Sequence, residues 1–140
     1  MSRKRKGDSK LHTDWYDYAK RDVAAARMLY NDPFTIIYGF FHCHQAAEKA
    51  LKGYLLYCNG YAPDGHNLIY LCRKVGEKIG EVNGFLELCV DLNIYYIQAR
   101  YPSDFKIEWL PEELVYYTGE IVKLFKILNK ESKNKKRERK

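Results

Sequence analysis

The sequence predicts an all-α protein, an antiparallel up-and-down bundle of four to five helices. Three observations predict this class. Apolar residues recur at helical spacing over long stretches, no stretch alternates apolar and polar residues over the length of a strand, and short loops rich in Pro, Gly and Asn separate the stretches. The chain has 140 residues, which fits one domain, and long helices joined by short loops pack as antiparallel neighbours.

The first two helices are expected at about residues 14–30 and 34–58. Asp32–Pro33 ends the first helix, because proline cannot continue it. The second stretch is long, rich in aromatic residues, Ala and Leu, and free of proline. Asn59–Gly60 then stops it, since glycine readily takes the left-handed conformation that ends many helices.

Three further helices complete the predicted bundle, at about residues 67–79, 83–99 and 111–128. Gly80 ends the third helix, and a Tyr-Pro-Ser-Asp run at residues 101–104 ends the fourth. The fifth begins at a proline, which suits the first turn of a helix. We expect it to fade into the charged run that follows.

Positive charge is concentrated at the two ends of the chain. The net charge is +6, yet residues 1–10 hold five Lys or Arg and one Asp, and residues 130–140 hold seven Lys or Arg and two Glu. The ends offer almost nothing to bury, so we expect residues 1–12 to be a basic disordered leader and residues 130–140 a basic disordered tail, around a bundle at 13–129. Such ends keep a protein soluble, or add non-specific affinity for a polyanion.

The four cysteines, at positions 43, 58, 72 and 89, are widely spaced and form no C-x-x-C. This pattern is not typical of a secreted disulfide framework or a zinc knuckle. No signal peptide follows the basic N-terminus, and no apolar run reaches the length needed to cross a bilayer. We therefore expect a reduced, cytoplasmic protein without membrane association.

The second predicted helix contains a polar cluster within the stretch FFHCHQAAEKALKGYLL, residues 40–56. At 100° per residue, His42, Gln45, Lys49 and Lys52 fall on one stripe, and Glu48 borders it. One interpretation is a solvent-exposed helix face. The other is the lining of a groove, in which Lys would meet a phosphate and Gln a base edge. Spacing alone leaves both interpretations open.

A metal site or a cysteine nucleophile in this cluster is not expected. His42, Cys43 and His44 are successive residues, and the two histidines point about 200° apart on an ideal helix. The stretch has no H-x-x-x-H or E-x-x-H spacing, and Cys43 lacks the strand-turn-helix context of a nucleophile elbow. We expect no metal and no cofactor, and we interpret Cys43 as a core thiol.

Four motifs together resemble the HEPN domain family (higher eukaryotes and prokaryotes nucleotide-binding) in its small stand-alone prokaryotic form. They are W-x-x-x-A-x-x-D-x-x-x-A at 15–26, Q-A-A-E-K-A-L-K at 45–52, G-H-N-L-I-Y-L at 65–71 and A-R-Y-P at 99–102. The resemblance spans about residues 13–128. It implies a helical bundle that usually forms a homodimer and binds a nucleotide or RNA. It also implies a minimal nucleotidyltransferase partner, often encoded next to the HEPN protein as a toxin–antitoxin-like pair.

Many members of the family are metal-independent ribonucleases with an R-x(4–6)-H motif, and this motif is missing from the predicted bundle. Starting from Arg100, the motif requires His at position 105, 106 or 107, and these positions hold Phe, Lys and Ile. Arg5 and His12 fit the spacing, but they precede the first predicted helix, so we treat that match as chance. We therefore expect binding without catalysis. The alternatives are a ribonuclease toxin with a displaced catalytic His and a non-catalytic dimeric scaffold.

His66 and Arg100 lie in two of the motifs that carry the resemblance, and each has two interpretations. His66 either packs the corner before the third helix or lies beside a groove. Arg100 either complements the dipole at the end of the fourth helix or binds an anion there. Tyr95, Tyr96 and Tyr101 either stack on a base or pack in the bundle. We assign no catalytic residue, and the candidate nucleotide-binding residues are His42, Gln45, Glu48, Lys49, Lys52, His66, Arg100 and Tyr101.

Overall fold

The computed structural model describes residues 7–104 and 106–138, and these residues form helices and loops without a strand. The all-α prediction is therefore confirmed. The elements are α1 (His12–Met28), α2 (Ile36–Asn59), α3 (Leu68–Gly76), the short 3-10 helix η1 (Gly80–Phe85), α4 (Leu86–Arg100) and α5 (Pro111–Glu138).

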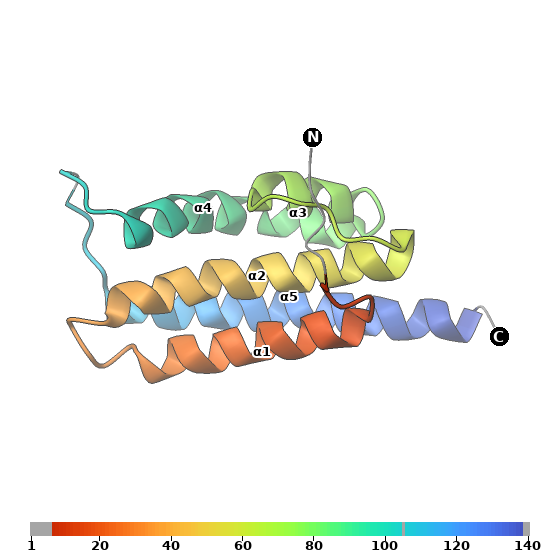
Figure 1. Ribbon diagram of the computed structural model, residues 1–140, viewed down its shortest axis with the longest axis horizontal. Helices are drawn as coiled ribbons and strands as arrows, with labels where there is room; N and C mark the ends of the chain where they lie inside the picture. The colour runs from red at the N-terminus through yellow and green to blue at the C-terminus, as the bar shows by residue number, and fades with distance from the viewer. Residues whose placement is uncertain (1–6, 105, 139–140) are drawn as a thin grey trace.

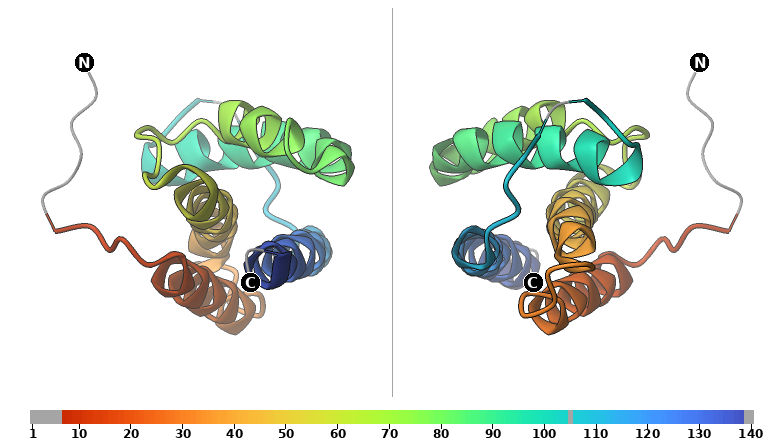
Figure 2. Two further views of the ribbon diagram at one scale, coloured as in Figure 1. Left: turned by 90° about the vertical axis from the view of Figure 1, so that its right-hand side faces the viewer. Right: turned by 90° about the vertical axis from the view of Figure 1, so that its left-hand side faces the viewer.

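Helix α2 lies at the centre of the bundle and contacts all four other α-helices. Figure 1 shows α1 and α2 as an antiparallel hairpin, with α5 running alongside. Seen along the bundle in Figure 2, α3 and α4 lie across the side of α2 and α5 that α1 leaves uncovered. This arrangement places α2 between α1 on one side and α3 and α4 on the other, so its polar residues can meet partners from both sides.

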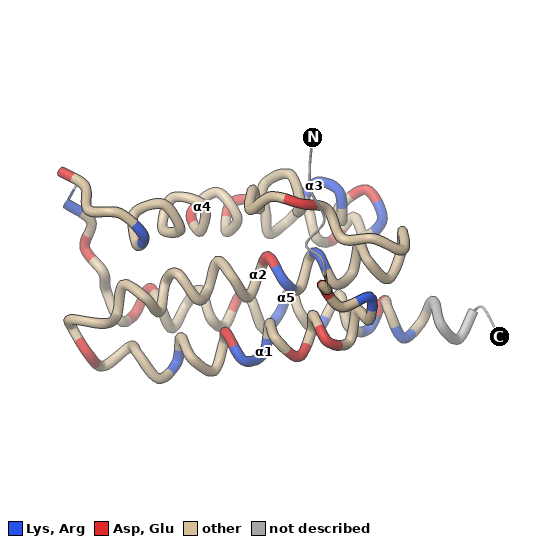
Figure 3. Tube along the Cα trace, in the orientation of Figure 1, with Lys and Arg blue, Asp and Glu red and all other residues tan. Residues whose placement is uncertain are grey.

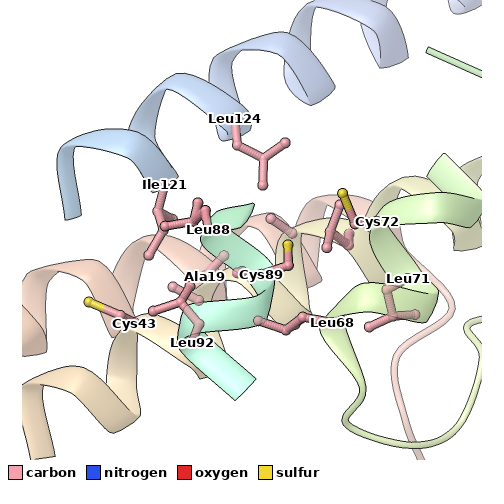
Figure 4. Packing of buried hydrophobic residues seen from close by; sticks show 14 of the residues in the cluster. Ala19, Cys43, Leu68, Leu71, Cys72, Leu88, Cys89, Leu92, Ile121 and Leu124 are labelled. Atoms are coloured by element: carbon pink, nitrogen blue, oxygen red, sulfur yellow. The ribbon is translucent and has the colours of Figure 1, made fainter. Parts of the chain in front are cut away.

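The core follows from the composition of α2, which is apolar or small on most of its surface. Ala46, Ala47 and Ala50 are completely buried, and their small side chains allow neighbouring helices to approach closely. Figure 4 shows part of this core, where side chains of α5 lie against those of α3 and α4. The largest fully buried apolar side chains are Tyr54, Phe40, Leu51, Leu55, Leu68, Leu71, Leu92, Leu114, Ile121, Leu124 and Leu128.

The cysteines take part in this core and form no disulfide. Cys43, Cys72 and Cys89 are buried, and Figure 4 shows them among aliphatic side chains. Burial raises the pKa of the Cys43 thiol to about 12, with a smaller contribution from the Asp22 carboxylate. Because the thiolate is the nucleophilic form, Cys43 is unreactive at neutral pH, which agrees with its interpretation as a core thiol.

The predicted fourth helix at 83–99 is divided in the structure. Residues 80–85 form η1, and α4 starts only at Leu86. Two glycines, Gly80 and Gly84, weaken α-helix formation here. Asn83 also ties η1 to the end of α3, because its Nδ2 donates to the carbonyl of Gly76 at 3.3 Å. A Cβ at position 76 would collide with the side chain of Asn83, which would have to move and give up this hydrogen bond.

The predicted tail at 130–140 overlaps helix α5, which continues through Glu138. Ser132 is 3% exposed, and its hydroxyl is 2.6 Å from the hydroxyl of Tyr16 on α1. This buried contact and the burial of Leu128 hold the helix against α1 beyond the expected end. Residues 139–140 lie outside the described residues.

The predicted leader at 1–12 also differs from the structure where it can be compared. Helix α1 begins at His12, and Trp15 Nε1 donates to the carbonyl of Ser9 at 2.9 Å, so the segment just before the helix is tied to it. Residues 1–6, which include Arg5 of the chance R-x(4–6)-H match, lie outside the described residues.

Candidate functional site

The polar residues of α2 divide into two clusters that face different neighbours. Helix geometry explains the division, because residues seven apart lie about 20° apart around a helix, whereas His42 and Lys52 lie about 80° apart. We call the first group the α1–α2 cluster; it comprises Asp22, His42 and Lys49. We call the second the α2–α4 cluster; it comprises His44, Glu48, Lys52, His66, Tyr96 and Arg100.

In the α1–α2 cluster a single carboxylate holds two basic side chains. Asp22 Oδ1 lies 2.9 Å from His42 Nδ1, and Asp22 Oδ2 accepts from Lys49 Nζ at 2.6 Å. Asp22 itself is buried. A carboxylate and a lysine at this distance largely cancel each other's charge. The cluster therefore ties α1 to α2 and leaves little positive charge for an anionic ligand.

Glu48 is the centre of the α2–α4 cluster. Its Oε1 lies 2.9 Å from His66 Nδ1, and its Oε2 lies 3.1 Å from Lys52 Nζ. The Glu48 and Lys52 side chains are each only 8% exposed. Buried charges of this kind are tolerated only when they are paired, so Glu48 and Lys52 depend on each other.

The loop between α2 and α3 brings His66 to Glu48. Gly60 ends α2 in the left-handed conformation at φ 81°. Asn67 then caps α3 by accepting from Ile69 N at 3.0 Å, and it also accepts from Asn93 Nδ2 on α4 at 3.0 Å. These hydrogen bonds hold the start of α3 against α4. They thereby also fix the position of His66, the residue before Asn67.

His44 supports the same corner from inside the bundle. It is completely buried, and its Nε2 donates to the carbonyl of His66 at 2.9 Å. Burial lowers the pKa of His44 below its ordinary value, despite the opposite influence of the Glu48 carboxylate. His44 is therefore neutral at physiological pH. Its Nδ1 has no hydrogen-bond partner among the described residues and lies 3.8 Å from Glu48 Oε1.

The ring of Tyr96 joins the two histidines to Arg100. It stacks on His44 with ring centroids 4.1 Å apart and on His66 with centroids 5.5 Å apart. The Tyr96 hydroxyl accepts from Arg100 Nη1 at 2.6 Å. Arg100 Nη2 also donates to the hydroxyl of Tyr101 at 3.3 Å.

Arg100 is exposed and carries an uncompensated charge. Its guanidinium carbon lies 4.9 Å from the ring centroid of Tyr96 and 5.2 Å from that of Tyr101. Within residues 7–104 and 106–134, no carboxylate lies within ion-pair distance of it. A guanidinium held by two phenols and free of carboxylates can bind an anion in two-point fashion.

The structure thus brings together some of the predicted residues and separates others. Glu48, Lys52 and His66 share one cluster, and Arg100 joins it through Tyr96, with Tyr101 beside it. His42 and Lys49 turn toward Asp22 instead, so the predicted stripe is divided. Gln45 lies between the two clusters on the surface of α2, and its buried Oε1 has no hydrogen-bond partner in the part of the chain that the structure describes.

Three residues outside the predicted set, Asp22, His44 and Tyr96, position the others. Asp22 is the Asp of the first HEPN-like motif, at residues 15–26, and this motif is the sequence feature that could have identified it. His44 is one helical turn before Glu48, so their shared face could have been derived from spacing. Tyr96 was considered for base stacking, but its contact with two histidines depends on how α4 lies against α2.

Two negative observations apply to the part of the chain that the structure describes. No group of three or more His, Cys, Asp or Glu side chains in that part is arranged to hold a metal ion. No helix among the same residues combines the length and the apolar character that a membrane span requires.

Comparisons with known proteins agree with the HEPN resemblance of the four sequence motifs. The model of the HEPN domain family matches residues 12–128. The crystal structure of an archaeal HEPN homologue is similar with a TM-score of 0.65 and 20% sequence identity, over 89% of this chain and 99% of that one. No curated protein matches the chain. The family match covers most of the chain, and the chain therefore belongs to the HEPN domain family.

Proposed function

We propose that the protein binds a nucleotide or RNA at the α2–α4 cluster without cutting it. The observation that carries the proposal is the exposed Arg100 guanidinium, held between Tyr96 and Tyr101 beside His66 and free of any carboxylate in the described residues. Arginine in such a setting suits a phosphate, and the exposed ring of Tyr101 suits stacking on a base.

His66 supplies a second polar contact for the ligand. Its side chain is 55% exposed, and the contact with Glu48 occupies Nδ1, so Nε2 is the ring nitrogen that remains for a ligand. Lys52 has the opposite role, because its ammonium is buried against Glu48. We therefore assign ligand contact to His66, Arg100 and Tyr101, and the support of His66 to Glu48 and Lys52.

A metal-independent ribonuclease is the second candidate function. The favouring observation is the His66–Glu48 contact of 2.9 Å, because a carboxylate that orients an imidazole is a common arrangement for a general base. Tyr96 connects this histidine to Arg100, as a displaced catalytic His would require. Binding is preferred because acid–base cleavage needs two titrating groups, and His44, the other histidine of the cluster, is buried and neutral.

Replacing Arg100 with alanine is expected to weaken nucleotide binding about 10- to 100-fold, because charge-assisted hydrogen bonds contribute about 1.5–3 kcal/mol. Isothermal titration with AMP and ATP measures this, and labelled RNA incubated with EDTA measures cleavage. Arg21→Ala is the matched control, since Arg21 is an exposed arginine that pairs loosely with Asp17 at 3.9 Å.

The outcomes of this experiment separate the three functions. Cleavage in EDTA that disappears in Arg100→Ala and persists in Arg21→Ala would replace the binding proposal with the ribonuclease. Absence of nucleotide binding at millimolar concentration, together with no binding of RNA, would favour a non-catalytic scaffold. Equal affinities for the two variants would remove Arg100 from the site.

We also propose a homodimer that forms along α4. The family resemblance implies a dimer, and α4 is apolar on two sides. Its inner side is in the core, while Val90, Ile94 and Ile97 are exposed at spacings of four and three residues, on one outward row. Exposed apolar residues gathered on one face of a helix mark an interaction surface, and a second copy of α4 would cover this row.

Replacing Ile94 and Ile97 together with lysine is expected to convert the dimer to a monomer, because two charges would be buried unpaired in the interface. Light scattering after size exclusion measures the mass. The matched control places lysine at Val115 and Tyr116, two exposed apolar residues of α5. A wild-type protein that is monomeric at high concentration, or a control that dissociates as readily, would contradict the α4 interface.

A minimal nucleotidyltransferase is the partner that we propose on the family resemblance, as in a toxin–antitoxin-like pair. The neighbouring reading frame is the first observation to make. Co-purification of its product with this protein would then test the pair directly. A neighbouring frame of unrelated type, with no nucleotidyltransferase binding to the purified protein, would count against it.

A further inference from the structure

Helix α5 changes its charge along its length. Its first twelve residues, 111–122, contain three Glu and no Lys or Arg, whereas residues 123–138 contain seven Lys or Arg and two Glu. Figure 3 shows blue positions on the part of α5 that approaches the C-terminus. In Figure 1 the same end of α5 reaches farther along the bundle than any other helix. The basic residues at 123–138 thus lie on helix α5.

Three lysines form a continuous face on this half of α5. Lys126, Lys130 and Lys133 are exposed and spaced by four and three residues, which places them on one side of the helix over about 10 Å. With Asn129 and Asn134 they line a shallow surface hollow of about 360 Å³. We call these five residues the α5 basic face.

The charge of the α5 basic face is not used within the described part of the protein. None of its three lysines forms an ion pair with a described residue. Lys123 differs, because it lies 2.8 Å from Glu120 one turn earlier. No acidic residue lines the hollow. The face therefore presents three ammonium groups and two amides to a ligand from solution.

We propose that the α5 basic face binds the phosphate backbone of an RNA strand, independently of sequence. Lysine acts as a point charge toward a phosphate, and asparagine amides donate hydrogen bonds to phosphate and sugar oxygens. Neutralised phosphates release counterions, so the binding depends strongly on salt.

An acidic protein or a membrane fits this face less well. Lysine is depleted in the cores of protein–protein interfaces, and the α5 basic face contains no aromatic or aliphatic residue that could anchor a partner. A membrane-surface helix needs an apolar face to insert. The apolar side of this half of α5 is already in the core, where Leu124 and Leu128 are completely buried.

The α5 basic face is separate from Arg100. Arg100 ends α4, and Figure 1 shows this end of α4 and the C-terminal end of α5 at opposite ends of the bundle. Pro111, which lies near that end of α4, is about 22 Å from Lys126 along the helix axis. A mononucleotide at Arg100 therefore cannot reach the face, but an oligonucleotide can. The inference rests on the proposed function to the extent that both require a nucleic-acid ligand.

The test compares the salt dependence of RNA binding between two triple variants. Fluorescence anisotropy with a labelled 20-nucleotide oligo(U) is measured from low to moderate KCl concentration. Lys126→Gln, Lys130→Gln and Lys133→Gln, combined, are expected to reduce the slope of log K against log salt by about 2, because each phosphate contact to a single strand contributes about 0.7. The control combines Arg73→Gln, Lys74→Gln and Lys78→Gln, three exposed basic residues on and just after α3, and is expected to keep the wild-type slope.

Two further arms make the outcome decisive. The α5 variant is expected to keep wild-type affinity for AMP, whereas Arg100→Ala is expected to lose it, so failure of one proposal is visible without failure of the other. Poly-glutamate at matched charge is expected to compete weakly with the oligonucleotide. The inference is overturned if both triple variants reduce the slope equally, if neither does, if wild type does not bind the oligonucleotide, or if poly-glutamate competes as well as RNA.

Discussion

Replacing Glu48 with leucine is expected to lower the free energy of unfolding by about 3–5 kcal/mol, the range observed when one partner of a buried ion pair is removed. Glu48 Oε2 is 3.1 Å from Lys52 Nζ, and both side chains are 8% exposed. The substitution leaves the Lys52 ammonium buried without its carboxylate, and it also removes the acceptor of His66. Urea denaturation at neutral pH, followed by circular dichroism, measures the change.

The control for this prediction is Glu77→Leu. Glu77 also pairs with a lysine on α3, Lys74, but at 3.9 Å and with both side chains well exposed, and such pairs contribute little. We expect a change within about 0.5 kcal/mol. A double variant, Glu48→Leu with Lys52→Leu, is expected to recover most of the loss, because two apolar side chains leave no unpaired charge. Equal losses for Glu48→Leu and Glu77→Leu would show that the pair is not buried in solution.

The helices themselves could be predicted from the sequence because they depend on local features. The apolar residues of α2 recur over six turns without proline, and Asn59–Gly60 provides a stop that the structure places at the same point. The start of α5 at Pro111 was also predicted correctly. Such features are visible within a window of a few residues, which is the range over which periodicity and helix ends act.

The division of the polar stripe could not be predicted, because it depends on where the neighbouring helices lie. Angles around α2 place Lys49 and Lys52 about 60° apart, and the sequence alone gives no reason to treat this difference as decisive. The difference becomes decisive in the folded protein. Lys49 pairs with Asp22 of α1, whereas Lys52 pairs with Glu48, and both side chains of that second pair are buried. The pairing partner is therefore a property of packing rather than of spacing.

The extent of α5 beyond Leu128 could not be predicted, for a similar reason. Composition after Leu128 is polar and charged, which is typical of a disordered end. The contact that continues the helix is a hydrogen bond between Ser132 and Tyr16, residues 116 positions apart in the chain. A single buried hydroxyl pair at this separation leaves no trace in composition, and only the packing of α1 on α5 reveals it.

Replacing Phe40 with alanine is expected to lower the free energy of unfolding by about 3–5 kcal/mol, the usual loss for a phenylalanine removed from a core. Phe40 is completely buried, and its ring centroid lies 4.7 Å from that of Tyr95, 5.2 Å from that of Trp109 and 6.0 Å from that of Tyr117. The alanine would leave a cavity between α2, α4 and α5 that three large rings cannot fill without moving. Urea denaturation measures the change, as for Glu48.

The same substitution at Phe34, which is 87% exposed, is the matched control and is expected to change the stability by less than about 0.5 kcal/mol. Comparing Phe40→Ala with Phe34→Ala also tests how the aromatic core supports the α2–α4 cluster. Tyr95 packs on Phe40, and the next residue, Tyr96, carries the contacts with His44 and Arg100. A cavity at Phe40 is therefore expected to weaken nucleotide binding while the protein is still folded, whereas Phe34→Ala leaves it unchanged. Unchanged affinity in folded Phe40→Ala would mean that α2 and the α3–α4 corner hold Tyr96 in place without the aromatic core.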